Sequence, residues 1–300
     1  MTTARVGFAG IGIMGEPMAG RLLDAGTPLT VWSRRAEACA GLVARGATLA
    51  TDPDTLFAAC EVLILMLRDE AATDAVLGRG TEAFARRVAD TRVVVMGTNS
   101  PAYSAALAAE VRAAGGGYVE APVSGSRVPA ERGELVVMLA GGRDSLDDSA
   151  LDDTAELLAP LARAVVRCGV VPGALRTKIA VNHYMMAMVA SLAESLATAR
   201  TAGVDLASVV RVLEASPMDS PIGRVKAAKL VAGDESPQAA IADVVKNCRL
   251  VLAAAREAGA ATPIIDVVAG LYERTAASGF ADADMVAVAR MFARPNDERG

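Results

Sequence analysis

The stretch Gly10-Ile11-Gly12-Ile13-Met14-Gly15 decides the fold of the N-terminal half. It follows the apolar run Arg5–Ala9, a predicted strand, and precedes Glu16–Asp24, a predicted helix. In such a unit the first glycine allows the tight turn, the second a close backbone approach to a ligand, and the third helix–strand packing. An anion at the helix N-terminus meets unpaired N–H groups and the positive end of the helix dipole. The stretch predicts a turn that binds a dinucleotide diphosphate, with a flexible glycine turn as the alternative.

The residues that follow have the rhythm of an α/β domain. Short apolar runs without period-two alternation alternate with alanine-rich helical stretches, as expected for a parallel sheet covered on both faces. Further strands are predicted at Leu29–Trp32, Val62–Met66, Val93–Met96, Tyr118–Ala121, Leu135–Ala140 and Ala164–Cys168. We therefore expect a Rossmann-type, doubly wound parallel sheet over residues 1–168.

Residues 169–300 are expected to form an all-α C-terminal domain for substrate binding and dimerisation. From Leu175 to Ala202 the chain has helix formers with apolar residues nearly all round, and such a helix must be buried. Further helices are predicted at Asp205–Ser216, Gly223–Val231, Ala239–Ala258, Ile264–Ala277 and Asp284–Phe292. The all-round apolar helix favours a homodimer or a dimer-based tetramer. Residues from about Pro295 are expected to be frayed.

The composition argues against several classes of protein. The net charge of −5 leaves no basic excess for nucleic-acid binding, and no apolar stretch is long enough to span a membrane. We expect no export signal, and the widely spaced cysteines Cys39, Cys60, Cys168 and Cys248 are typical of cytosolic thiols. One histidine, His183, cannot supply the usual zinc ligands. We expect a cytoplasmic protein without a metal.

The end of the second predicted strand selects the cofactor. An acidic residue there would bind the ribose 2′-hydroxyl and select NAD, but this chain has Trp32-Ser33-Arg34-Arg35. A guanidinium group can donate two hydrogen bonds to one phosphate. The segment predicts NADP(H), and a solvated basic loop is the alternative.

Two later segments resemble signatures of the β-hydroxyacid dehydrogenase family, which includes 3-hydroxyisobutyrate dehydrogenase-like proteins. Residues 120–135 (EAPVSGSRVPAERGEL) resemble its substrate-binding signature, and Gly169 through Lys178 and Asn182 resemble its G-x3-G-x4-K-x3-N segment. The resemblance covers residues 4 to about 292. The Ser-Gly-Ser-Arg-Val-Pro-Ala-Glu run and the Val-Trp-Ser-Arg segment look most like the NADPH-using glyoxylate and succinic semialdehyde reductase branch.

The matching residues have expected roles. Lys178 and Asn182 share one helix face. Burying a lysine in an apolar helix costs free energy, so this lysine is expected to have a functional role. A lysine that reaches water along the helix is the alternative. The resemblance implies that Lys178 is a general acid that protonates the carbonyl oxygen, that Asn182 orients the substrate or the lysine, and that Ser124, Gly125 and Ser126 bind a substrate carboxylate. The predicted cofactor contacts are Gly10, Gly12, Ile13, Met14, Gly15, Ser33, Arg34, Arg35, Leu67, Thr98 and Lys246.

Some positions depart from the family pattern. Asn247 replaces the usual aspartate beside Lys246, and Gly97 stands where many relatives have serine. Ala239 and Ile241 occupy a region where the branch usually places an aromatic residue, and a smaller wall there leaves room for a larger substrate than glyoxylate. His183 points away from the Lys178 face and is expected to be a packed helix histidine.

These patterns favour NADPH-dependent reduction of a small aldehyde acid to a hydroxy acid, or the reverse oxidation. One alternative is imine reduction, a reaction of distant relatives that usually lack this lysine. The other is a catalytically silent NADP-binding sensor or scaffold protein. Retention of Lys178 argues against both.

Overall fold

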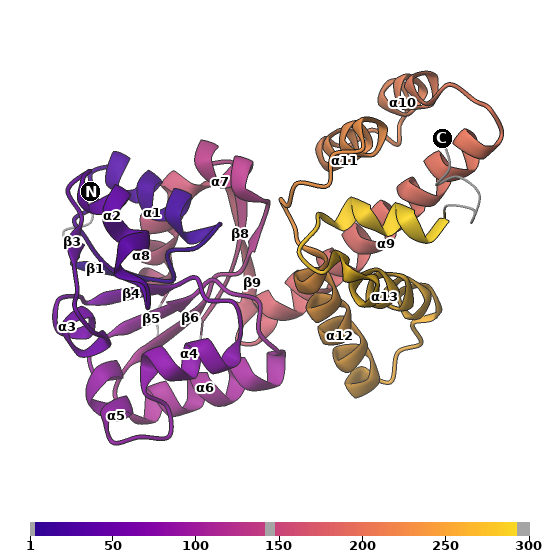
Figure 1. Cartoon of the computed structure of the whole chain (residues 1–300). Helices are drawn as coiled ribbons and strands as arrows, with labels where there is room; N and C mark the ends of the chain where they lie inside the picture. The colour runs from indigo at the N-terminus through magenta and orange to yellow at the C-terminus, as the bar shows by residue number, and fades with distance from the viewer. Residues whose placement is uncertain (1–3, 142–147, 293–300) are drawn as a thin grey trace. The chain divides into compact units, whose positions relative to one another are not determined.

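A computed structural model describes residues 4–141 and 148–292 (Figure 1). The chain divides into two compact units, Met1–Lys178 and Ile179–Gly300. The prediction for residues from Pro295 lies outside the described residues. None of the described helices is long and apolar enough to cross a membrane.

The first unit is built on a mostly parallel sheet. Its strands are β1 (Val6–Ala9), β2 (Leu29–Trp32), β3 (Thr48–Leu49), β4 (Val62–Leu65), β5 (Arg92–Val95), β6 (Gly117–Glu120), β7 (Val123–Ser124), β8 (Leu135–Gly141) and β9 (Ala162–Val170). The order is β3-β2-β1-β4-β5-β6-β8-β7, and β9 pairs with β8. From β3 to β6 the strands are parallel and have the order of a dinucleotide-binding sheet, which confirms the predicted fold class.

The far edge of the sheet differs from the expectation of a wholly parallel sheet. Strand β8 runs antiparallel to β6, and the short strands β3 and β7 were not predicted. Parallel neighbours need a long crossover connection that returns the chain to the same end of the sheet. Here the segment after β6 contributes β7, which pairs antiparallel with β8, so the chain reverses direction instead.

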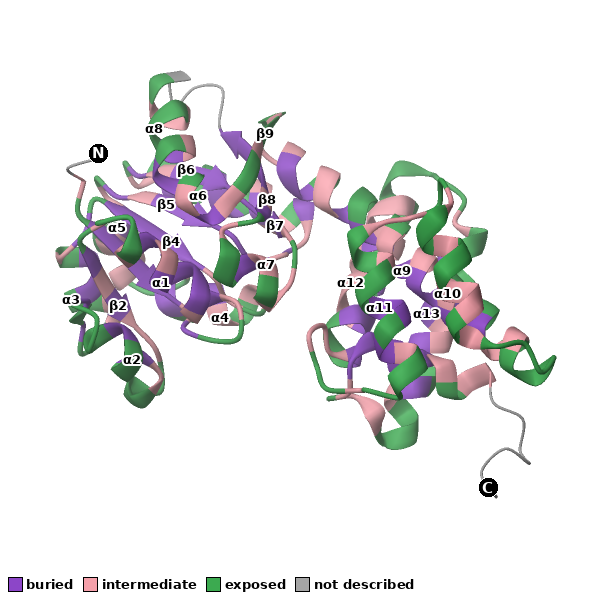
Figure 2. Ribbon diagram, turned by 90° about the horizontal axis from the view of Figure 1, so that it is seen from above, coloured by how far each residue is buried: buried purple, intermediate pink, exposed green. Residues whose placement is uncertain are grey.

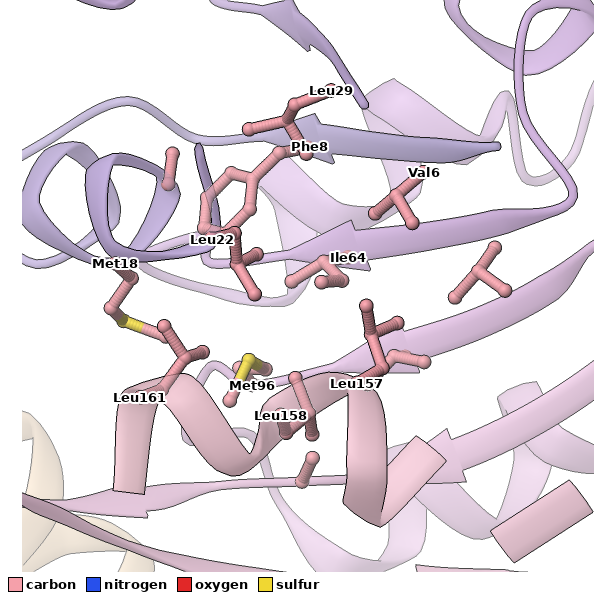
Figure 3. Packing of buried hydrophobic residues seen from close by; sticks show 14 of the residues in the cluster. Val6, Phe8, Met18, Leu22, Leu29, Ile64, Met96, Leu157, Leu158 and Leu161 are labelled. Atoms are coloured by element: carbon pink, nitrogen blue, oxygen red, sulfur yellow. The ribbon is translucent and has the colours of Figure 1, made fainter. Parts of the chain in front are cut away.

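Helices cover both faces of this sheet. They are α1 (Gly15–Asp24), α2 (Ala40–Val43), α3 (Pro53–Ala58), α4 (Glu70–Leu77), α5 (Ala83–Val88), α6 (Pro101–Ala113), α7 (Arg127–Arg132) and α8 (Asp148–Leu158), with 3-10 turns at Ala36–Cys39 and Ala159–Leu161. On one face Met18 and Leu22 of α1 and Leu157 of α8 pack over Phe8 and Ile64 (Figure 3). The opposite face is covered by residues of α3 to α6. Double coverage explains why every residue of β1 and β4 is buried.

The second unit is helical, as predicted. Helix α9 (Gly173–Thr201) begins in the first unit, and after it come α10 (Leu206–Ala215), α11 (Pro221–Ala232), α12 (Ile241–Ala258), α13 (Pro263–Thr275), the π-helical turn η3 (Ala276–Phe280) and the 3-10 helix η4 (Met285–Phe292). Buried residues of α9, α12 and α13 form its core (Figure 2). Within the single chain α9 is not buried on every side, because Tyr184 is 71% exposed.

A buried ion pair joins the loop before α12 to its neighbours. The Lys226 ammonium donates to both carboxylate oxygens of Asp284, at 2.8 and 2.9 Å, and both residues are buried. Backbone N–H groups of Gln238 and Ala239 also donate to Asp284. Ile241, which follows, is fully buried in the helical core. The segment around Ala239 is therefore held by hydrogen bonds rather than by a large side chain.

Candidate functional site

The carboxyl ends of the parallel strands are joined by a row of backbone hydrogen bonds. The N–H of Gly10 donates to Trp32 O, that of Met66 to Ala9 O, that of Met96 to Leu65 O and that of Ala121 to Val95 O, at 3.3, 2.9, 2.8 and 2.8 Å. Several predicted cofactor residues lie at this row or within two residues of it: Gly10, Ser33, Leu67 and Thr98. The structure therefore brings them together at the edge where dinucleotides bind in such sheets.

The three glycines of the turn have different reasons to be glycine. Gly10 has φ +100°, and a Cβ there would lie 2.2 Å from the carbonyl oxygen of Met66. A Cβ on Gly15 would lie 1.9 Å from the carbonyl oxygen of Gly10. Gly12 differs, because a Cβ there would meet no described atom within 4 Å. Packing explains Gly10 and Gly15, whereas Gly12 leaves open space for the close approach of a ligand.

The start of α1 fits a diphosphate in this space. Its N-cap residue, Met14, makes no side-chain capping bond, and the neighbouring Ile13 is 58% exposed. The first N–H groups of a helix attract anions, and the helix dipole adds to the attraction. The residues present at this turn therefore fit a dinucleotide cofactor.

Arg34 and Arg35 lie just beyond β2, beside the glycine turn. Both are exposed, and no carboxylate among residues 4–141 and 148–292 pairs with either guanidinium group. Ser33, which lies between Trp32 and Arg34 in the chain, is half-buried. Two exposed guanidinium groups that pair with no described carboxylate are suited to bind the phosphate that distinguishes NADP from NAD.

Two residues in the segment after β5 differ from expectation: Gly97 departs from the family pattern, and Asn99 was not predicted to have a role. A Cβ on Gly97 would lie 2.5 Å from the carbonyl oxygen of Leu67, so this backbone has no room for the serine of many relatives. Thr98 is half-buried. Asn99 is 2% exposed, and neither atom of its amide has a hydrogen-bond partner among the described residues. A buried amide without a hydrogen bond lowers the free energy of unfolding, and few buried polar groups in proteins are left in this state.

The predicted substrate loop joins β7 to α7. Ser124 ends β7 and pairs with Val136 of β8, Gly125 has φ +136°, and Ser126 is the N-cap residue of α7 without a side-chain capping bond. Next in the chain, Arg127 donates to Glu16 of α1 at 2.9 Å. This ion pair links the start of the loop helix to the first turn of the predicted cofactor helix.

The predicted catalytic pair lies on α9. Lys178 is half-buried, and Asn182, one helical turn later, is 3% exposed. Residues four apart share one helix face, as expected. His183 is half-buried beside them. Lys246 lies on α12 in the second unit, and the side-chain oxygen of its neighbour Asn247 is buried without a partner in the described residues.

Sequence reasoning assigned no role to Glu120, which ends β6 and is fully buried. One of its oxygens accepts from the Ser104 hydroxyl at 2.5 Å, and the other accepts from the N–H groups of Ala174 and Leu175 at 3.1 and 3.2 Å. Burial raises the pKa of the Glu120 carboxyl, and these hydrogen bonds and the charge of Arg176 offset part of the increase. A glutamate at the end of a buried strand was the signal in the sequence.

Metal ligands are not gathered anywhere in the described part of the chain. Residues 4–141 and 148–292 contain no group of three or more His, Cys, Asp or Glu side chains that could hold an ion.

Comparison with protein families gives two matches that follow each other along the chain. Residues 5–169 match the NAD binding domain of 6-phosphogluconate dehydrogenase. Residues 174–292 match the NAD-binding domain of NADP-dependent 3-hydroxyisobutyrate dehydrogenase.

Similar proteins cover the chain almost from end to end. The chloroplastic glyoxylate/succinic semialdehyde reductase 2 of Arabidopsis thaliana is 31% identical over 287 residues, which are 95% of this chain and 78% of that protein. Reductase 1 of the same plant is 28% identical over 283 residues, which are 94% and 96% of the two chains. The crystal structure of 3-hydroxyisobutyrate dehydrogenase (ygbJ) from Salmonella typhimurium is 27% identical, covers 95% and 99% of the two chains, and superposes with a TM-score of 0.85.

Proposed function

The chain belongs to the β-hydroxyacid dehydrogenase family, whose members are NAD(P)-dependent enzymes, and from this premise we propose that it reduces a small aldehyde acid to a hydroxy acid with NADPH, or catalyses the reverse oxidation. The observation that carries the proposal is the pair formed by Lys178 and the buried Asn182, one turn apart on α9. The two reductases of Arabidopsis thaliana support glyoxylate or succinic semialdehyde as the class of substrate.

The cofactor in this proposal is NADP(H). When bound, its nicotinamide supplies or accepts the hydride. The turn at Gly12 and the start of α1 would hold the diphosphate, and Arg34 and Arg35 would hold the 2′-phosphate. Ile13, Leu67, Thr98 and Lys246 are proposed as further contacts. The open space at Gly12 and the two exposed guanidinium groups, which pair with no carboxylate among the described residues, support this assignment.

The chemical step in the proposal is performed by Lys178. Its ammonium donates a proton to the carbonyl oxygen and stabilises the developing alkoxide. Asn182 orients the substrate or the lysine. The Ser124 hydroxyl and the backbone N–H groups of Gly125 and Ser126 hold the carboxylate, because oriented donors of this kind bind anions.

The test follows NADPH oxidation with glyoxylate, succinic semialdehyde, methylglyoxal, which has no carboxylate, and a cyclic imine. We expect activity with the two aldehyde acids, and a loss of roughly 10²- to 10⁴-fold in kcat for Lys178→Ala, which is the usual contribution of a general acid. Arg200→Ala, which removes an exposed positive charge from the last turn of the same helix, is the control and is expected to stay active. Equal rates for Lys178→Ala and wild type would refute the role of the lysine. Turnover of the imine alone would favour imine reduction.

We also propose that two copies of the chain associate through their helical units. None of the ten residues of α10, all of them described, is buried, and Val212 is 66% exposed. Met218, just after α10, is 70% exposed, and Tyr184 on α9 is 71% exposed, so the helical unit has further exposed large apolar side chains. Light scattering after size exclusion should give a dimer or a dimer-based tetramer, and a monomer at micromolar concentration would contradict the proposal.

A reducing, cytosolic location is a further proposal. All four cysteines lie in the described residues as free thiols. Burial raises the pKa of Cys60 and of Cys248 to about 12, so neither is a reactive thiolate at neutral pH. Thiol titration of the denatured protein purified without reductant should give four thiols, and fewer would argue for an oxidising compartment.

A further inference from the structure

The helix that carries Lys178 follows directly on a proline, Pro172. Helices α3, α4, α6, α10 and α11 each have a capping side chain in the residue just before them: Asp52, Asp69, Ser100, Asp205 and Ser220. In α9 the first bond of the helical pattern runs from the Arg176 N–H to Pro172 O. Proline has no side-chain acceptor, so the first N–H groups of this long helix need a partner from elsewhere.

Glu120 is that partner, although it lies more than 50 residues earlier in the chain. Its Oε2 accepts from both Ala174 N and Leu175 N, the second and third residues of α9. All three residues are buried. A carboxylate here satisfies two of the unpaired N–H groups and compensates the positive end of the helix dipole.

The other oxygen of Glu120 is held by a directed chain of hydroxyl groups. Ser104 of α6 has one hydroxyl proton and donates it to Glu120 Oε1 at 2.5 Å. The Tyr118 hydroxyl, 2.7 Å from Ser104 Oγ, must then be the donor in that contact. Both residues are buried, so the carboxylate is fixed from both sides.

The start of α9 is also fixed by its backbone. A Cβ on Gly173 would lie 2.1 Å from the carbonyl oxygen of Cys168 in β9, so the first turn rests directly on the strand. The helix can therefore shift little without breaking the bonds to Glu120. Lys178 follows Ala174 by four residues, which is about one turn of helix.

We infer that Glu120 is a positioning residue that sets the place of Lys178 relative to the loop at Ser124. Glu120 precedes Ser124 by four residues in the β6–β7 segment, and its carboxylate binds α9 one turn before Lys178. One side chain thus connects the proposed carboxylate-binding loop to the proposed proton donor. The role in catalysis rests on the proposed function, whereas the cap on α9 does not.

Three variants separate the contact from the charge. Glu120→Gln retains an oxygen acceptor for Ala174 and Leu175, and its amide can donate to Ser104. Glu120→Asp retains the charge but is one methylene shorter, so it cannot reach both sides. Glu120→Ala removes both the acceptor oxygens and the charge. The matched control is Asp52→Ala, which removes the cap of α3 far from α9 in the chain.

The measurements are kcat, the KM values for aldehyde acid and NADPH, and deuterium exchange of residues 174–178. For Glu120→Asp and Glu120→Ala we expect kcat to fall about 10- to 100-fold, since misplacement by about 1 Å can reduce a rate that much. The KM for NADPH should stay within about twofold, and exchange in the first turn of α9 should rise. Glu120→Gln should restore most of kcat and of the protection, and Asp52→Ala should keep wild-type kcat.

Several results would overturn the inference. One such result is a Glu120→Asp variant with the kcat and the exchange protection of wild type. Another is full activity of Glu120→Asp together with a loss of kcat in Glu120→Gln. An equal loss of kcat in Asp52→Ala would reduce the effect to general instability. If Lys178→Ala is inactive while Glu120→Ala is normal, this inference fails and the proposed function stands. If Lys178→Ala is fully active, the proposed function fails, and exchange in Glu120→Ala still tests the cap.

Discussion

Helices α1 and α9 each begin at a glycine, but their N-termini are completed in opposite ways. At α1 the N-cap residue Met14 makes no side-chain bond, and the turn before it is open at Gly12. At α9 the N–H groups of Ala174 and Leu175 are bound by the buried carboxylate of Glu120. The first N-terminus has room for an anion from outside, whereas the second contains its anion as part of the fold.

The difference explains how the two helices serve one proposed reaction. An anion that completes α1 stabilises the bound state, so part of the binding free energy of a diphosphate comes from the helix itself. The carboxyl group that completes α9 belongs to the chain itself, so the N–H groups one turn before Lys178 have an acceptor without any ligand. A cofactor must leave after turnover, but a proton donor must stay in place.

The largest expected effect comes from Gly10→Ala, which puts a steric clash into the turn that precedes α1. The new Cβ would be 2.2 Å from the Met66 carbonyl oxygen, at a backbone φ of +100°. We expect a loss of about 3 kcal/mol or more in the free energy of unfolding, from strain and overpacking together. Urea unfolding measures the loss. A variant with wild-type stability would show that the turn has another conformation.

A second, smaller effect is expected from Arg34→Ala, which tests the charge beside the turn. Loss of a charge-assisted hydrogen bond of roughly 1.5–3 kcal/mol should raise the Kd for NADPH about 10- to 100-fold and leave the Kd for NADH unchanged. Arg163→Ala, an exposed arginine on β9, is the control of equal charge. Titration by nucleotide fluorescence gives both constants. An equal weakening for NADH would mean that Arg34 does not select the phosphate.

Gly12→Ala should be smaller still, and it should change binding without changing stability. A methyl group here meets no described protein atom within 4 Å, but it occupies the space proposed for the diphosphate. We expect the midpoint of thermal unfolding within about 1–2 °C of wild type, since the variant removes no contact. The Kd for NADPH should rise roughly tenfold. Unchanged affinity would move the diphosphate away from this turn.

The two N-termini also show what a sequence can predict. The turn at α1 was predictable because its glycines, strand and helix are consecutive, and the apolar run Val62–Met66 correctly indicated a strand buried on both faces. The cap on α9 was not, because Glu120 and Ala174 meet only after the sheet has formed. The reversal at β8 was missed for the same reason, since strand direction depends on pairing. The sequence pattern of α9 predicted burial but not what covers each face, and in the single chain Tyr184 is exposed.

The smallest expected effect is a difference in pH dependence between buried and exposed caps. The exposed Asp52 has a lowered pKa, first because of the hydrogen bond from the Thr55 backbone, so its contribution to stability is lost as pH falls through that pKa. Glu120 has a raised pKa, first because of burial. A carboxyl group whose folded pKa lies above its unfolded value binds more protons in the folded state, so stability falls as pH rises from its usual range through the folded pKa.

Glu120→Gln tests the sign of this pH dependence because it keeps an acceptor for Ala174 and Leu175 and a donor for Ser104 but does not titrate. In urea unfolding measured from pH 4 upward, wild type should lose stability relative to Glu120→Gln as pH rises, until Glu120 is ionised, after which the difference should be constant. Asp52→Asn should lose stability relative to wild type over the lowest part of the same range, as Asp52 ionises. If Glu120→Gln parallels wild type at every pH, the carboxyl group has the same pKa folded and unfolded. The hydrogen bonds from Ser104, Ala174 and Leu175 and the charge of Arg176 would then offset the whole effect of burial on this carboxyl group.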